Sequence, residues 1–274
     1  MNKQFINGML LAFVAFASCE SLAGFDEGKA AFMARDFATA LKEFKPLADT
    51  GDKQAQHILG MMYDEGQGVK QDYAQAAEWY KQAASQGHQD AQYNLGVMYA
   101  QAQGVKQDDV ESFKWFEKAA KQGHILSQFA LGRLYTVGRG TKPDGKLACD
   151  WYRRAADQNH YKAQLALGKN YLDGNGIKKD VKMAESWIRK SAEQGHHKAE
   201  YELGLLYRKG IAVKKDEKEA YMWLELAAKQ DHVGAAQERD AMAKNMKAED
   251  IATAKLAASN WHAKLPADTK PVVH

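Results

Sequence analysis

The apolar residues of this chain recur at a fixed interval. A leucine-glycine pair and a tryptophan each return every 36 residues, five times, with no insertion or deletion between the copies. The pairs are Leu59-Gly60, Leu95-Gly96, Leu131-Gly132, Leu167-Gly168 and Leu203-Gly204. The tryptophans are Trp79, Trp115, Trp151, Trp187 and Trp223. A period between about 20 and 50 residues predicts an array of stacked repeats.

The first half of each repeat has the apolar spacing of a helix. In the second repeat, Ala91, Leu95, Met98 and Tyr99 fall at i, i+4, i+7 and i+8, which is one helical face. We expect this helix to end near Gln103-Gly104, because glycine readily adopts the left-handed conformation that ends helices. A glycine inside a helix costs about 1 kcal/mol relative to alanine, so its return beside each leucine indicates close packing against a neighbouring helix.

The second half of each repeat predicts another helix, which begins at a recurring aspartate. An aspartate side chain accepts hydrogen bonds from the free N–H groups of the first helical turn, so it is a favourable N-cap. These residues are Asp72, Asp108, Asp144, Asp180 and Asp216. The periodic tryptophans lie on the apolar face of this helix with small alanines, and we interpret them as packing residues rather than as a ligand cage.

The alternation of two helices per repeat predicts an all-α fold, a right-handed α-solenoid of helix-turn-helix repeats with one concave side. We expect five repeats of 36 residues over residues 55–234. A capping helix pair, perturbed by Pro46, is expected at residues 24–54, and capping helices at residues 235–265. Residues 266–274, with two prolines, are expected to form a disordered tail.

The repeat pattern resembles a known family. Residues 55–91 follow A-x-x-x-L-G-x-x-Y-x-x-G-x-G-V-x-x-D-x-x-x-A-x-x-W-x-x-x-A-A-x-x-G-x-x-x-A throughout. This is similar to the Sel1-like repeat (SLR), a longer relative of the tetratricopeptide repeat, and the resemblance extends over about residues 55–235. It implies an α-solenoid that serves as a scaffold or adaptor for other proteins, and it does not name the partner.

The first residues have the composition of an export signal. Lys3 precedes the apolar run Met9–Ala17, and Ser21-Leu22-Ala23 places small residues before a cleavage site, which predicts a signal peptide at residues 1–23. The run is too short to span a bilayer, which needs about 20 residues. We expect a bacterial, periplasmic location, with secretion as an alternative. Phe16-Ala17-Ser18-Cys19 also resembles a lipobox, so a lipid anchor at Cys19 stays open.

Charge and cysteine content bear on the class of partner and on disulfide formation. Lysine and arginine number 38 against 35 acidic residues, and this near balance gives no reason to expect nucleic acid as a partner. Cys149 is the only cysteine after residue 23. We interpret it as a packed small side chain, with an intermolecular disulfide as the alternative.

No pattern of catalytic or metal-binding residues accompanies the repeats. The motifs G-x-S-x-G, S-x-x-K and H-E-x-x-H are absent from the sequence, so we predict no catalytic residues and no cofactor. One histidine per repeat is too widely spaced to converge on one metal ion, and we place these residues in the turns between repeats. They are His88, His124, His160, His196 and His232.

A partner is expected to contact first-helix positions that differ between repeats. By resemblance to tetratricopeptide arrays, these face the concave groove. They are Tyr93, Val97, Phe129, Arg133, Leu165, Lys169, Tyr201, Leu205 and Arg208. An apolar stripe beside the three cations would suit an extended or helical peptide with acidic character. The alternative is that the large apolar residues pack against the next repeat.

The function predicted from these features is that of a non-catalytic, exported adaptor that binds a protein through its solenoid. One alternative is an envelope-associated β-lactamase-like or cell-wall-binding SLR protein. That group carries paired cysteines in each repeat, which this chain lacks. A secreted effector that binds host proteins is the other alternative.

Overall fold

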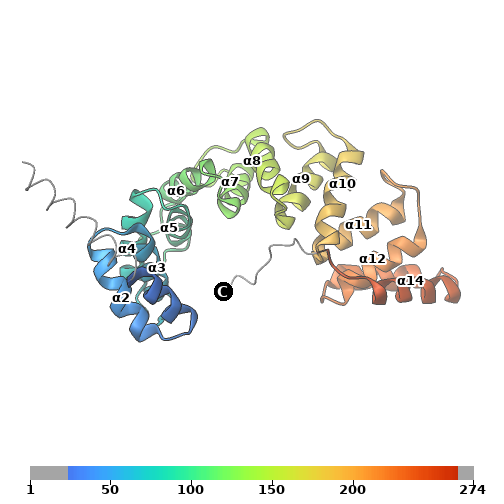
Figure 1. The fold of residues 1–274 in the computed structure, drawn as a ribbon. Coiled ribbons are helices and arrows are strands. Elements are labelled where there is room, and N and C mark those ends of the chain that lie inside the picture. Colours follow the sequence, from blue (N-terminus) through green and yellow to red (C-terminus); the bar gives the residue numbers. More distant parts are fainter. Residues whose placement is uncertain (1–23, 265–274) are drawn as a thin grey trace, which may run out of the picture. The chain divides into compact units, whose positions relative to one another are not determined.

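A computed structural model of the protein describes residues 24–264. All regular secondary structure within these residues is α-helical. Figure 1 shows the helices following one another along the chain, each joined to the next by a short turn or loop. The predicted signal peptide, Cys19 and the tail at residues 266–274 lie outside the described residues.

The helices are short and nearly equal in length. After a helical segment at residues 24–33, they are α2 (Phe37–Asp49), α3 (Lys53–Glu65), α4 (Tyr73–Ser85), α5 (Gln89–Gln101), α6 (Asp109–Lys121), α7 (Ile125–Val137), α8 (Gly145–Asp157), α9 (Tyr161–Asp173), α10 (Val181–Glu193), α11 (His197–Lys209), α12 (Glu217–Ala228), α13 (Val233–Ala243) and α14 (Ala248–Asn260). Each predicted repeat contributes two of them.

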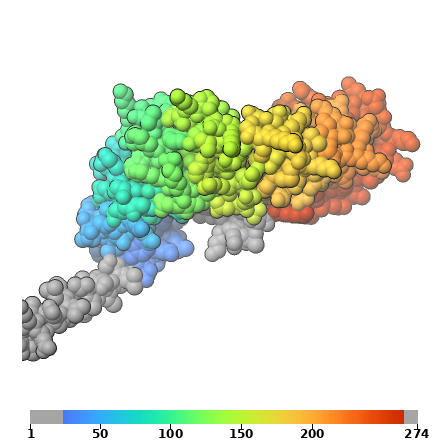
Figure 2. Space-filling view, turned by 90° about the horizontal axis from the view of Figure 1, so that it is seen from above, coloured from blue at the N-terminus to red at the C-terminus, as the bar shows by residue number. Residues whose placement is uncertain are grey.

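The chain divides into two compact units, Met1–Ser127 and Gln128–His274, and each is described by itself. In the first unit α3 packs on α4 and α5 packs on α6. In the second unit α9 packs on α10 and α11 on α12, and α12 also contacts α13 and α14. Figure 2 shows that, within each unit, successive repeats are neighbours at the surface. The predicted all-α solenoid of consecutive helix pairs is therefore confirmed.

The aspartates begin the second helices as predicted. Each of the five is the N-cap residue of its helix, and its carboxylate accepts a hydrogen bond from one or two backbone N–H groups in the first turn. At Asp72, Oδ1 accepts from the N–H groups of Ala74 at 2.9 Å and Gln75 at 3.0 Å. The sequence therefore determines where these helices begin.

The end of one first helix differs from the prediction. α5 ends at Gln101, and Ala102 is its C-cap with φ of 58°. The predicted end near Gln103-Gly104 is therefore too late. Gly66 holds the equivalent position of the first repeat, with φ of 70°. Ala102 thus adopts a left-handed conformation that a side chain with a Cβ atom disfavours.

The core is formed by the repeated leucines, which are fully buried in every repeat. Two tryptophans, Trp187 and Trp223, are buried as predicted, whereas the other three are half-buried. Lys118 lies 3.8 Å above the centroid of the Trp115 ring. The half-buried rings are therefore partly covered by the chain's own cations.

Helices outside the five repeats pack against the cores at both ends of the described residues. Phe44 on α2 is fully buried, and Pro46 lies inside this helix, which nevertheless continues to Asp49. At the other end, Trp261 packs against Trp223, with ring centroids 5.7 Å apart. Within residues 24–264, none of the helices combines the length and the apolar character needed to span a membrane.

Candidate functional site

In the first unit, two predicted partner-binding residues lie on α5. Tyr93 and Val97 are both half-buried. The Tyr93 ring centroid lies 5.7 Å from that of Phe116 and 4.9 Å from that of His124. Tyr93 therefore packs on the second helix of its own repeat and on the residue that precedes the next repeat, and leaves part of its surface open.

In the second unit, the predicted apolar positions are not equally accessible. Phe129 on α7 is half-buried, and its ring lies 4.7 Å from that of His160. Leu165 on α9 is only 8% exposed and belongs to the core. Tyr201 and Leu205 on α11 are half-buried. Packing against the neighbouring repeat therefore accounts for Leu165, and the apolar stripe is interrupted there.

Two of the three predicted cations are already neutralised by carboxylates. Lys169 on α9 donates to Glu202 on α11 at 2.7 Å, and Arg208 on α11 pairs with Glu238 on α13. Arg133 is exposed, and no ion pair is found for it within residues 24–264. An acidic ligand would therefore find one unpaired cation among these three residues.

The periodic histidines have a structural role that the sequence reasoning missed. His88, His160 and His232 are the N-caps of α5, α9 and α13. In each, Nδ1 accepts a hydrogen bond from the backbone N–H three residues later, at 3.1 to 3.3 Å. Asp52, a favourable N-cap residue, lies at the equivalent position before α3. The repeat register could therefore have indicated that these histidines are N-caps.

Three of the periodic histidines, His160, His196 and His232, belong to a continuous row of rings in the second unit. Neighbouring centroids are separated by 4.5 to 5.8 Å. In order, the members of this ring row are Phe129, His160, Tyr161, His196, His197, His232 and Tyr201. The row includes two predicted partner-binding residues, Phe129 and Tyr201, and joins the beginnings of α9, α11 and α13.

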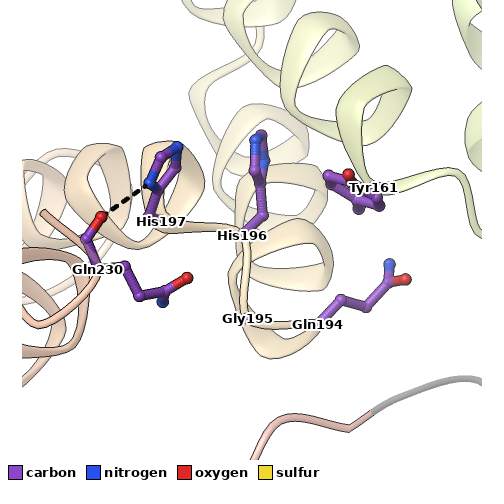
Figure 3. Close-up of a pocket in the computed structure, with 6 residues that line it drawn as sticks. All are labelled: Tyr161, Gln194, Gly195, His196, His197 and Gln230. Atoms are coloured by element: carbon purple, nitrogen blue, oxygen red, sulfur yellow. Dashed lines mark hydrogen bonds between the residues drawn. The ribbon is translucent and has the colours of Figure 1, made fainter. Parts of the chain in front are cut away.

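A pocket of about 370 Å³ lies beside the middle of the ring row. Figure 3 shows His196 between Tyr161 and His197. Tyr161 is the first residue of α9, and His196 and His197 lie at the beginning of α11. The ends of α10 and α12 complete the lining with Gln194, Gly195 and Gln230. His197 Nδ1 lies 3.4 Å from the carbonyl oxygen of Gln230. The pocket therefore combines aromatic surface with amide and imidazole groups.

His160 and His196 are neutral at neutral pH. Burial, and next the charge of Lys162, lower the pKa of His160 to about 4. Burial, with a smaller contribution from His197, lowers the pKa of His196 to about 4 as well. Burial also lowers the pKa of His232. These rings offer hydrogen-bonding nitrogens and apolar surface rather than positive charge.

Cys149, the cysteine within the described residues, is packed in the protein interior. Cys149 is 2% exposed, its thiol donates to the carbonyl oxygen of Asn175 at 3.2 Å, and burial raises its pKa. This agrees with the packed side chain expected from the sequence. Between residues 24 and 264, no group of three or more histidine, cysteine or acidic side chains is arranged to hold a metal ion.

Comparison with known proteins agrees with the repeat geometry. The Sel1 repeat pattern matches residues 53–88, 89–124, 125–160, 162–196 and 197–232. No curated protein matches the chain in sequence.

Two solved structures are similar over most of the chain. A protective antigen of uropathogenic Escherichia coli strains, which displays an SLR fold, superposes with a TM-score of 0.81 at 32% identity and covers 89% of this chain. This chain spans only 54% of that antigen. A Sel1 repeat protein from Oxalobacter formigenes has a TM-score of 0.72 and 34% identity, covering 85% of this chain and 98% of its own. With five matching repeats and these relatives, the chain belongs to the Sel1 repeat family.

Proposed function

We propose that this protein is an exported, non-catalytic adaptor that binds a protein partner through the ring row and the adjoining pocket of its second unit. Membership of a family whose repeats form protein-interaction solenoids supports an adaptor role. The observation that carries the proposed surface is the ring row, in which half-buried and exposed aromatic side chains lie beside an open pocket. Rigid aromatic groups in such a setting commonly dominate protein recognition.

The chemistry of the pocket favours an uncharged segment of the partner. Its His196 is neutral at neutral pH, and the glutamine amides offer donors and acceptors. A partner segment with an apolar or aromatic side chain and exposed backbone groups would match both features. This differs from the acidic peptide expected from the sequence, because Lys169 and Arg208 already have carboxylate partners.

Export is proposed from the amino-terminal sequence. Residues 1–23 carry the charge, apolar run and small residues of a signal peptide. The similar E. coli protein is described as a protective antigen, which fits an exported location. The periplasm is the proposed destination, with secretion or a lipid anchor at Cys19 as the alternatives.

Tyr161 tests the surface, and Tyr73 is its matched control. Both tyrosines are 37% exposed and lie at the first position of a helix, but only Tyr161 belongs to the ring row. The native protein and the Tyr161→Ala and Tyr73→Ala variants would each be used to capture partners from native envelope extracts. A partner captured by the native chain and by Tyr73→Ala, and lost with Tyr161→Ala, is the expected result. Equal capture by all three forms would contradict this surface.

Export is tested independently by cell fractionation and amino-terminal sequencing. We expect the mature chain in the periplasmic fraction with residues 1–23 removed. A membrane-bound form that is released by Cys19→Ser would indicate the lipid anchor instead. Retention of an uncleaved chain in the cytoplasm would contradict export without bearing on partner binding.

A further inference from the structure

A buried polar side chain recurs in the first helix of each repeat, and its chemistry changes in the last one. Each lies three residues before the repeated leucine and is almost completely removed from solvent. They are Gln56, Gln92, Gln128, Gln164 and Glu200. A carboxyl group therefore stands in the last repeat where the other four have an amide.

In the fourth repeat, the amide of Gln164 connects the ends of two helices, α8 and α10. Gln164 Nε2 donates to the carbonyl oxygen of Ala156 at 3.2 Å, near the end of α8. Gln164 Oε1 accepts from Gln194 Nε2, just after α10, at 2.7 Å. Both bonds are made by one buried side chain, because an amide carries a donor and an acceptor.

Glu200 makes only half of this arrangement. Glu200 is fully buried, and its Oε2 accepts a hydrogen bond from Gln230 Nε2 at 3.0 Å. Oε1 is buried and has no hydrogen-bond partner among the described residues. In the repeat register, the carbonyl group corresponding to that of Ala156 belongs to Ala192. An ionised carboxylate has no proton to donate there, whereas a protonated carboxyl has one.

We propose that Glu200 is a proton-dependent lock: in its neutral form the carboxyl donates to the Ala192 carbonyl group and joins the ends of α10 and α12, and ionisation releases this junction. The lock lies within the second unit and does not depend on the proposed partner. The step is a simple loss of the carboxyl proton to solvent when the junction opens. A buried carboxylate left without its second partner then destabilises the closed form.

Electrostatics at the junction agree with this assignment. Burial raises the pKa of Glu200 from an ordinary 4.5 to about 7. Other titratable groups lie at the adjoining ends of α10, α11 and α12, and none forms a hydrogen bond or ion pair with the Glu200 carboxyl group in the described structure. They are Glu193, His196, His197, Lys198, Lys229, Asp231 and His232.

The sign of the pH effect follows from the raised pKa. The folded form holds this proton more tightly than the opened form, so the contribution of Glu200 to stability is complete below pH 4.5 and is lost as the pH rises to about 7. The shift corresponds to a change on the order of 100-fold in the equilibrium between the closed and opened junction.

Amide hydrogen exchange on the full chain tests the lock. The native protein, Glu200→Gln and the matched Gln164→Glu variant would be compared at pH 5, 6, 7 and 8, after correction for the intrinsic exchange rate. In the native protein, protection of α11 and α12 should fall with rising pH, by on the order of 100-fold if exchange follows this junction. Glu200→Gln should remove this dependence, and Gln164→Glu should create it in α9 and α10.

Two results would overturn the proposal. One is an unchanged pH profile in Glu200→Gln. The other is a Glu200 carboxyl carbon that titrates near pH 4.5 in the native protein by nuclear magnetic resonance, a measurement that needs no variant. If Gln164→Glu folds at pH 5 but not at pH 8, that outcome supports the lock, because it shows the same proton dependence in a second repeat.

Discussion

Gly132 on α7 lies directly against the ring of Tyr152 on α8, so that a Cβ atom at this glycine would stand 2.5 Å from Cε1 of the tyrosine. Tyr152 is buried and has little room to move. The glycine of the leucine-glycine pair is therefore required by contact between the two helices of one repeat, as the sequence pattern indicated.

Gly132→Ala should destabilise the protein by about 1–3 kcal/mol, because the added methyl group overpacks the helix contact. The control is Gly234→Ala in α13, where the nearest atom to an added Cβ is 3.4 Å away. That variant should be neutral or more stable by up to about 1 kcal/mol, as alanine is the better helix former. Urea denaturation followed by circular dichroism measures both. Similar effects of the two substitutions would contradict the packing explanation.

Ala102→Gly should stabilise the protein by about 1 kcal/mol, because φ of 58° disfavours any residue with a Cβ atom. The reciprocal change, Gly66→Ala at the equivalent C-cap, should destabilise by a similar amount. Thermal and urea denaturation of the two variants check this. A loss of stability in Ala102→Gly would mean that contacts of the alanine methyl group outweigh the backbone strain.

Phe129→Ala should lower the free energy of unfolding by about 1–3 kcal/mol, because the ring is half-buried against His160. Arg133→Ala, one helical turn later, should change it by less than about 0.5 kcal/mol, since that side chain is exposed and unpaired within the described structure. Denaturation curves compare the two. If Phe129→Ala leaves stability unchanged while it abolishes partner binding, the ring belongs to the binding surface alone.

Stability should fall as the pH is lowered from 6.5 toward 4. His160 and His196 have pKa values of about 4 in the folded protein and ordinary values near 6.5 in the unfolded chain. The unfolded state therefore takes up protons first, and this stability is present above pH 6.5 and lost toward pH 4. The thermal midpoint should decrease by a few degrees. His160→Asn keeps an N-cap residue, and it should reduce this dependence.

Glu200 gives the opposite slope between pH 4.5 and 7, so the histidine effect is best measured in a Glu200→Gln background. An unchanged acid profile in His160→Asn, Glu200→Gln would show that His160 does not contribute to acid sensitivity.

Cys149 should react slowly with thiol reagents in the folded protein and completely after unfolding, because the side chain is buried and its pKa is raised. A Cys19→Ser background leaves Cys149 as the only thiol. Ellman's reagent with and without urea measures the two rates. Rapid labelling of the folded chain, or a disulfide-linked dimer on a non-reducing gel, would favour the intermolecular pairing that the sequence left open.

The sequence by itself determined the repeat length, the two helices per repeat and the aspartates that begin the second helices. These follow from local chemistry, namely helical spacing of apolar residues and the hydrogen-bonding needs of a helix end. Repetition strengthened each inference, because one residue type returned at the same position five times. Membership of the Sel1 repeat family could be predicted from the sequence for the same reason.

Only the tertiary structure decided which varying positions remain accessible. Leu165 is buried while Phe129 and Tyr201 are half-buried, and Lys169 and Arg208 meet carboxylates from the following first helices. The ring row and the unpartnered oxygen of Glu200 likewise depend on residues that are distant in sequence. A repeat pattern fixes what is identical in each repeat, whereas contacts between repeats depend on the particular side chains that stacking brings together.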